Sequence, residues 1–171
     1  MNNEALKSKT GPGDGWGTPQ DLFDEIAKLF LPGLGLVFDP CPNINRILSG
    51  THCYNGFDAT EDWHGKVGKR GSFINPPFSN IAPFILPAFE AASSEIPTVM
   101  LVPSRTDTPW WHTAMTLGKV IHIRGRVKYV DPISGLVGGA PSFASSLLLF
   151  GQEMGIESWW PECHKRGKNA S

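Results

Sequence analysis

A chain of 171 residues with 40% hydrophobic and 18% charged residues has the length and composition of one globular domain. No apolar stretch approaches the roughly 18–20 residues that span a bilayer, and the first residues lack the apolar core of a signal peptide, so we expect a cytoplasmic protein. The net charge of −1 is unevenly divided: residues 1–62 carry four Lys/Arg against nine Asp/Glu, and residues 63–171 carry eleven against seven. The later part of the chain is therefore the place to expect an anionic partner.

The first elements are marked by turn and cap residues. Residues 1–15 are rich in Gly, Lys, Asn and Asp, and we expect a flexible N-terminal arm or a loop beside a ligand site. A helix follows, with Thr18 as its N-cap, Pro19 at its first position and apolar residues at helical spacing until it ends near Pro32. The stretch 40–70 has little periodicity and is predicted to be mostly loop.

Strands and helices alternate along the rest of the chain. We predict strands at 36–38, 72–75, 98–102, 120–123 and about 143–150, and helices within 80–94 and at 108–117. Pro83 and Pro87 must start the first of these helices late, kink it or divide it, whereas Thr108 caps the second. Residues 159–171 are polar and basic and are expected to form a loose tail, which leaves a single domain over 16–158. The alternation predicts an α/β fold with a mostly parallel sheet flanked by helices.

The clearest chemical signal is the tetrapeptide Asn75, Pro76, Pro77 and Phe78, which follows a short apolar strand. Neither proline can donate a ladder hydrogen bond, so the strand must stop there and leave a rigid backbone. The Asn75 side-chain oxygen and the Pro76 carbonyl can each accept one N–H of a planar amine such as N6 of adenine, and Phe78 can stack on the ring. The alternative is a diproline turn capped by Asn75, with Phe78 in the core.

In its context the tetrapeptide resembles the fourth motif of amino-group methyltransferases that use S-adenosylmethionine. More narrowly, the chain resembles the phage-type DNA N6-adenine methyltransferases, the Dam-type phage family. The resemblance rests on six ordered blocks, at residues 16–23, 38–41, 58–63, 75–79, 101–112 and 123–126. It implies a Rossmann-like S-adenosylmethionine-dependent methyltransferase fold encoded by a bacteriophage or prophage and acting in the bacterial host. It also implies direct methyl transfer to N6 of adenine in DNA after base flipping, with Asn75, Pro76, Pro77 and Phe78 catalytic.

The resemblance also assigns a cofactor site. Asp39 and Pro40 stand where the family has its first cofactor motif, with Asp39 near the methionine part, and Trp16, Thr18 and Pro19 match the segment that encloses that end. Asn75 is shared between this site and the catalytic one. The chain departs from the wider superfamily because the strand before Asp39 is not followed by a Gly-rich turn, so the backbone must approach the cofactor differently.

A second carboxylate is expected to contact the adenosine part of the cofactor. Asp58 is our candidate and Asp62 its competitor, because a carboxylate at either place can accept hydrogen bonds from ribose hydroxyls or the adenine amine. The structural alternative for either residue is the N-cap of a short helix near Trp63.

Several basic and aromatic residues are candidates for DNA contacts. Arg124 and Arg126 are predicted to bind phosphates, which contributes affinity without sequence choice. The other candidates lie after the tetrapeptide and around the helix at 108–117: Ser79, Arg105, Asp107 and Trp110. Trp110 is equally compatible with helix packing, and Lys66, Lys69, Arg70 and Lys128 complete a possible basic rim.

Other functions remain open at this level. The three cysteines form no CxxC pair or four-ligand set, so no metal site is expected, and Cys41 lies in the cofactor motif rather than at a catalytic position. The same Asn-Pro-Pro chemistry serves enzymes that methylate adenine in RNA or glutamine in proteins, although the latter generally have Tyr where Phe78 stands. A methyltransferase fold that has lost turnover and only binds nucleic acid or protein is the remaining alternative.

Overall fold

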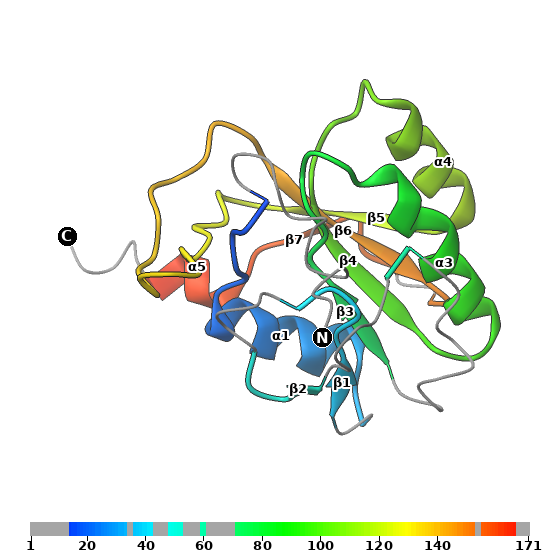
Figure 1. The fold of residues 1–171 in the computed structure, drawn as a ribbon, viewed down its shortest axis with the longest axis horizontal. Helices are drawn as coiled ribbons and strands as arrows, with labels where there is room; N and C mark the ends of the chain where they lie inside the picture. Colours follow the sequence, from blue (N-terminus) through cyan, green and yellow to red (C-terminus); the bar gives the residue numbers. More distant parts are fainter. Residues whose placement is uncertain are drawn as a thin grey trace, which may run out of the picture.

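The computed structural model of the chain describes residues 14–33, 36–42, 48–52, 59–60, 71–152 and 155–166. Its strands are β1 (Val37–Phe38), β2 (Thr51–His52), β3 (Ser72–Ile74), β4 (Thr98–Pro103), β5 (Lys119–Ile123), β6 (Ser145–Phe150) and β7 (Ser158–Trp159). Its helices are α1 (Gln20–Phe30), α3 (Ala82–Ser93), α4 (Pro109–Leu117) and α5 (Glu162–Arg166). Helices flank the central sheet, with α1 and α5 apart from α3 and α4 (Figure 1), so the predicted α/β architecture is confirmed.

The described strands form one sheet in the order β2-β1-β3-β4-β6-β5-β7. Only β6 runs against its neighbours, pairing antiparallel with both β4 and β5. From β1 the chain moves outward to β2 and then returns to place β3 on the other side of β1. The strand order therefore reverses between β1 and β3, and in open α/β sheets a crevice forms at the carboxyl ends of such a pair.

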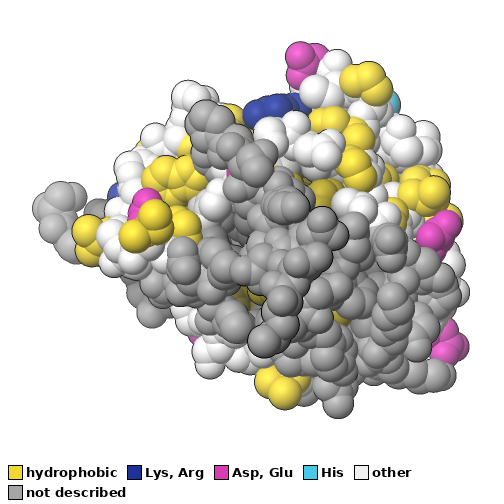
Figure 2. Space-filling view, viewed as in Figure 1, with side chains coloured by type: hydrophobic (Ala, Val, Ile, Leu, Met, Phe, Trp, Pro, Cys, Tyr) yellow, Lys and Arg dark blue, Asp and Glu magenta, His cyan; other side chains and the backbone are white. Residues whose placement is uncertain are grey.

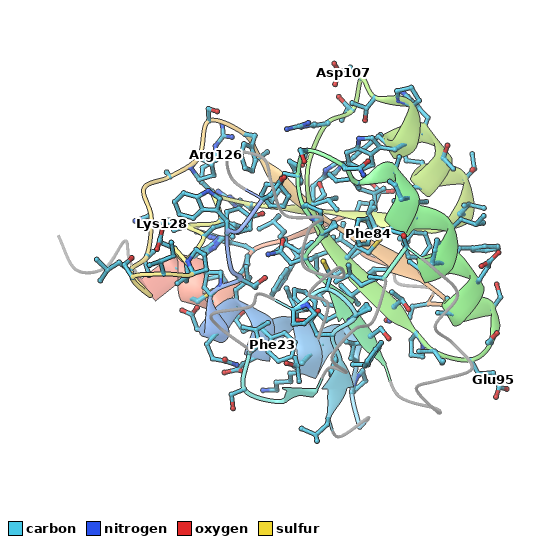
Figure 3. All side chains as sticks on the ribbon, in the orientation of Figure 1. Phe23, Phe84, Glu95, Asp107, Arg126 and Lys128 are labelled. Carbon is cyan, nitrogen blue, oxygen red and sulfur yellow. The ribbon has the colours of Figure 1, made fainter. Side chains whose placement is uncertain are left out.

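The core has two halves, one on each face of the sheet. Successive residues of a strand point to opposite faces, so Phe73 packs in the cluster with α1, and Ile74 packs in the cluster with α3 and α4. Figure 3 labels one aromatic ring from each half, Phe23 on α1 and Phe84 on α3. Because both faces are covered, the central strands β4 and β6 are buried along their whole length, which explains their apolar runs at 99–103 and 147–150.

Prolines lie at the start of α1 and α3 and inside α3. Pro19, not Thr18, is the N-cap of α1, and no side chain caps this helix, so the predicted capping role of Thr18 is wrong. Helix α3 is one continuous segment that contains Pro87. Pro83 lies in its first turn, where a missing N–H costs nothing, so only Pro87 removes an internal bond. Pro87 and the neighbouring Ala88 are buried on the face of α3 that packs on the core.

The predicted loose tail at 159–171 is wrong for residues 159–166. Strand β7 pairs parallel with β5, and α5 follows it. The Glu25 carboxylate of α1 accepts hydrogen bonds from the backbone N–H groups of Glu162 (2.8 Å) and Cys163 (2.7 Å). A carboxylate from a distant helix thus caps the N-terminus of α5 and fixes it against α1.

Candidate active site

The tetrapeptide lies where the sequence predicts, at the carboxyl end of β3. The β3–β4 ladder ends with Ile74 paired to Met100, so the carbonyls of Asn75 and Pro76 lie beyond the last paired residue. Asn75 is only 8% exposed, and both prolines are buried. A rigid, buried backbone with carbonyls outside the ladder is therefore present at this strand end.

The orientation of the Asn75 amide is fixed by a neighbouring segment. Its Nδ2 donates a 2.8 Å hydrogen bond to the carbonyl of Trp16. Only the amide NH₂ group can donate to a carbonyl, so the side-chain oxygen must point the other way. Asn75 Oδ1 is buried and has no hydrogen-bond partner in the part of the chain that the structure describes. Such an orphaned acceptor is expected where a ligand donor belongs.

Asp14 holds the other end of the tetrapeptide. Its carboxylate accepts hydrogen bonds from the Ser79 backbone N–H (2.9 Å) and the Ser79 hydroxyl (2.6 Å). Asp14 is 2% exposed. Its expected place in the flexible arm 1–15 is therefore wrong, because a contact across 65 sequence positions orders it. Ser79, predicted to contact DNA, has its hydroxyl proton committed to Asp14; residues 1–13 lie outside the described part.

The segment after Asp14 lies between the tetrapeptide and the loop that follows β5. Gly17 exchanges backbone hydrogen bonds with Val130 (2.7 and 2.8 Å), and the Trp16 ring covers Gly138, where an added Cβ would come within 2.5 Å of the ring. The buried hydroxyl of Thr18 has no hydrogen-bond partner among the described residues. Thr18 Oγ1 and Asn75 Oδ1 are thus two unpaired polar atoms on segments joined directly by the Trp16–Asn75 bond.

Asp39 lies at the carboxyl end of β1, next to β3. The register pairs Phe38 with Ser72, which places Asp39 and Asn75 at the same edge of the sheet, beside the reversal of strand order. Asp39 is 5% exposed, and its Oδ1 accepts a 2.9 Å hydrogen bond from the Cys41 N–H, which shapes the turn through the buried Pro40. The two competing carboxylates, Asp58 and Asp62, lie outside the described residues.

The structure places Phe78 in the core. Its ring makes edge contacts with Tyr129 (centroids 5.2 Å apart) and Phe143 (5.7 Å), and the residue is 7% exposed. The Tyr129 hydroxyl lies 3.0 Å from the Ser145 hydroxyl, and burial raises the pKa of Tyr129 far above its ordinary value. This is the packing alternative for Phe78; stacking on adenine stays a prediction that depends on the small exposed part of the ring.

The two predicted phosphate contacts, Arg124 and Arg126, line one groove. The groove has a volume of about 560 Å³ and lies between the start of α1, the loop after β5 and the segment 160–164. Lys128 and His164 line it as well, with Asp21 as the acidic residue. We call this the basic groove.

The segment 160–164 gives the basic groove its aromatic wall. The Arg124 guanidinium lies 4.2 Å from the centre of the Trp160 ring, a cation–π contact, and the His164 ring nitrogen lies 3.2 Å from the Arg124 carbonyl. In Figure 3, Arg126 and Lys128 lie on the side of the molecule that carries α5.

The structure separates the other predicted DNA contacts from the basic groove. Arg105 and Asp107 are exposed in the turn before α4, and Figure 3 shows Asp107 at the far tip of this turn, away from Arg126. Trp110 is half-buried against the core and contacts Trp111 edge-on, with centroids 5.7 Å apart. Of the residues proposed for the basic rim, Lys66, Lys69 and Arg70 lie outside the described residues.

A family model describing DNA N-6-adenine-methyltransferase (Dam) matches residues 6–166 of the chain. The chain belongs to this Dam family. The match covers every described residue of the site, from Asp14 to His164, and the predicted family resemblance is confirmed. Comparison with curated proteins and with solved structures finds no match.

Two properties of the described residues bear on the other predictions. No helix among them is long and apolar enough to cross a membrane. Over the same residues, no three His, Cys, Asp or Glu side chains are grouped so as to hold a metal ion. Cys41 is buried and lies in the turn held by Asp39.

Sequence reasoning missed Asp14, Tyr129, Trp160 and His164. Asp14 stands in a Gly-rich stretch, which gives no local signal of burial. The helix α5 did leave a signal: Pro161 and Glu162 at its start and basic residues at its end match the preferences of helix termini. Because α5 has only five residues, this signal is short, and the polar composition of the segment favoured the prediction of a loose tail.

Proposed function

We propose that the chain transfers a methyl group from S-adenosylmethionine to N6 of adenine in DNA, by direct displacement after the adenine is flipped out of the duplex. The observation that carries this proposal is the buried, unpaired Asn75 Oδ1 at the end of β3. Membership in the Dam family supports the choice of adenine in DNA as the substrate.

Asn75 and Pro76 polarise the target amine in this proposal. The lone pair of an exocyclic amine is delocalised into the ring, so the nitrogen is a poor nucleophile until its N–H groups are bound by acceptors that favour tetrahedral geometry. Asn75 Oδ1 and the Pro76 carbonyl supply two such acceptors. The Trp16 carbonyl fixes the orientation of the Asn75 amide by accepting a hydrogen bond from its Nδ2. Both acceptors are neutral amide oxygens, so they polarise the N–H bonds without taking the proton. As the new nitrogen–carbon bond forms, the carbon–sulfur bond would break, S-adenosylhomocysteine would leave, and the amine would lose one proton to solvent. Acceptors fixed in advance inside a dry site contribute roughly 10²–10³ in rate.

The residues around the reversal of strand order fit a cofactor. S-adenosylmethionine supplies an electrophilic methyl group, so the protein needs only to align the two reactants, polarise the amine and exclude water. The unpaired Thr18 hydroxyl and the buried Asp39 supply an acceptor and a carboxylate for the methionine end, with Trp16 and Pro19 enclosing it. Pro40 continues the turn that Asp39 shapes, in place of a Gly-rich loop.

The strand order supports a Rossmann-like methyltransferase fold. It combines a reversal between β1 and β3 with a single antiparallel strand, β6, inserted between β4 and β5. The ligand crevice of a Rossmann-like sheet lies at such a reversal, and Asp39 and Asn75 follow the two strands that border it.

DNA is held, in this proposal, by the basic groove. Arg124 and Arg126 bind phosphates in this proposal. Ser79 is a further candidate after β3, and Arg105, Asp107 and Trp110 are candidates around the start of α4. Phosphate contacts set affinity and position without reading sequence. Base flipping costs a few kcal/mol, which these contacts must offset.

The test is methyl transfer by the purified protein. Tritiated S-adenosylmethionine is incubated with duplex DNA, RNA and a protein mixture, and digested DNA is analysed by mass spectrometry for N6-methyladenine. Label in DNA as N6-methyladenine is the expected result. Label found only in RNA or protein would mean that the substrate is not DNA. If no substrate is labelled and calorimetry detects no binding of S-adenosylmethionine, the result supports a binding module without turnover, the alternative suggested by the absent Gly-rich turn.

A further inference from the structure

The loop between β5 and β6 ends in a stiff turn at residues 131–137. The Asp131 carboxylate accepts hydrogen bonds from the Ile133 N–H (2.9 Å), the Ser134 N–H (2.7 Å) and the Ser134 hydroxyl (3.0 Å). Backbone bonds from Gly135 to Asp131 and from Asp131 to Leu136, both 2.9 Å, close the turn. The hydrogen bonds from Ser134 lower the pKa of Asp131, so its charge is held by the turn itself.

This turn presents apolar side chains to solvent. Ile133 is 85% exposed, Leu136 70% and Val137 62%, the highest values among the exposed large hydrophobic residues that the structure describes. Figure 2 shows hydrophobic side chains on the side of the molecule that this loop occupies in Figure 1. Apolar side chains held outward by a stiff turn contribute nothing to the core, so a partner surface is the simplest reason for them.

The base of the turn is built into the candidate active site. Tyr129 packs on Phe78, and Val130 pairs with Gly17 on one side and with Val137 on the other. Gly138 donates a 2.8 Å hydrogen bond to the Tyr129 carbonyl and lies under the Trp16 ring, whose own carbonyl holds Asn75. The exposed tip therefore has a fixed position relative to the amine-binding oxygen.

The basic groove begins at the same turn. Val137 lines it together with Arg124, Arg126, Lys128 and His164. The acidic groups nearby are Asp21, which lines the groove, and Asp131, whose oxygen faces the N–H groups of its own turn. Because Val137 belongs both to the turn and to the lining of the groove, a DNA strand bound there through its phosphates would pass beside the apolar tip. Three basic side chains, Arg124, Arg126 and Lys128, against one acidic side chain favour a polyanion such as the DNA backbone as the occupant of the groove.

We propose that Ile133 and Leu136 form a wedge that enters the base stack beside the target adenine and fills the space left when that base is flipped out. The inference rests on the proposed function and adds to it the element that opens the duplex. Apolar side chains inserted between base steps compensate for lost stacking.

The test compares two DNA substrates for one pair of substitutions. After the methylated site has been mapped, transfer rates are measured for the target adenine paired with thymine and for the same adenine opposite an abasic site. The double substitution Ile133→Ser with Leu136→Ser should slow transfer about tenfold on the paired substrate. It should slow transfer less than about threefold on the abasic substrate, because the adenine there is already unpaired. The fluorescence of 2-aminopurine at the target position should fall in parallel.

Matched variants separate the wedge from other roles. Leu86→Ser, at an exposed apolar residue of α3 on the other side of the sheet, should leave both rates unchanged, and the exchange Ile133→Leu with Leu136→Ile should restore them. Equal losses on the two substrates, or no loss, would overturn the wedge while leaving the methyltransferase intact. A change of oligomeric state in the serine variant would identify a protein interface instead. A wild-type protein without transfer to any DNA would overturn both proposals.

Discussion

Replacement of Asn75 by alanine separates the chemical role of this residue from its structural one. In the folded protein the substitution removes one 2.8 Å hydrogen bond and leaves the Trp16 carbonyl without its donor. That loss should lower the free energy of unfolding by about 1–3 kcal/mol. The same substitution deletes one of two acceptors for the amine, which should lower the rate constant for transfer by roughly 10²–10³, or about 2.7–4 kcal/mol of transition-state stabilisation.

The two effects are measured independently. Turnover is followed with tritiated S-adenosylmethionine at saturating DNA, cofactor affinity by calorimetry, and stability by thermal unfolding. We expect kcat to collapse while the Kd for S-adenosylmethionine stays within a few fold, because the amine contact matters chiefly in the transition state. Asn80→Ala is the matched control: this exposed asparagine lies in the turn that follows the tetrapeptide and should be silent in all three assays.

One result would refute the reasoning. If the Asn75→Ala protein melts lower but turns over at nearly the wild-type rate, the unpaired oxygen has no role in amine polarisation and Asn75 only holds the Trp16 segment. If cofactor affinity falls as far as kcat, the residue acts on the cofactor rather than on the amine.

Three further predictions follow from the described contacts. Thr18→Val removes a buried hydroxyl that lacks a partner among the described residues, so thermal melting should show equal or up to about 1 kcal/mol higher stability, and calorimetry should show about 2–10-fold weaker binding of S-adenosylmethionine. The control Thr51→Val loses a 2.8 Å hydrogen bond to the Leu48 carbonyl and should instead lower the stability of the protein. A Thr18→Val protein that is less stable but binds the cofactor normally would contradict the assignment. Arg124→Ala should weaken DNA binding, measured by fluorescence anisotropy, and reduce the slope of the logarithm of the DNA association constant against the logarithm of the salt concentration by about 0.9. Lys28→Ala is the surface control. An unchanged slope would mean that Arg124 does not contact a phosphate. Burial, aided by the charges of Glu25 and Asp21, raises the pKa of Cys163 from 9.0 to about 12, so at neutral pH its alkylation, followed by peptide mass spectrometry, should be about a thousandfold slower than that of an ordinary thiol; labelling at the ordinary rate would mean that α5 does not stay docked on α1.

Regular elements with strong local patterns were predictable. The predicted strands at 98–102 and 143–150 correspond to β4 (Thr98–Pro103) and β6 (Ser145–Phe150), because continuous apolar runs between turn residues are typical of strands buried on both faces. The helix at 108–117 is also confirmed as α4, with Thr108 at the N-cap position. The predicted capping role of Thr108 is wrong, because its hydroxyl donates to the Arg105 carbonyl (2.8 Å) and no side chain of the described residues caps α4. The two-residue strand β2 lies in the stretch predicted to be mostly loop, since it is too short to leave any periodicity.

The candidate site was predictable only where backbone chemistry decides it. Two prolines must end a strand wherever it lies, so the place of Asn75 and Pro76 at the end of β3 follows from the sequence. The positions of Thr18 and Asp14 did not follow from the sequence. Pro19 rather than Thr18 is the N-cap of α1. Asp14 is ordered by Ser79, which is 65 positions away along the chain.

By itself, the sequence determined the alternation of strands and helices and the rigid strand end at Asn75 and Pro76, because spacing and the missing N–H of proline act locally. Tertiary structure alone decided which way the Asn75 amide faces, through the Trp16 carbonyl 59 positions away. It also decided that α5, seated on Glu25 across more than 130 positions, forms a wall of the basic groove. These contacts join residues whose neighbours in the chain carry no trace of the pairing, and only the packing of the whole sheet and its helices brings them within hydrogen-bond distance.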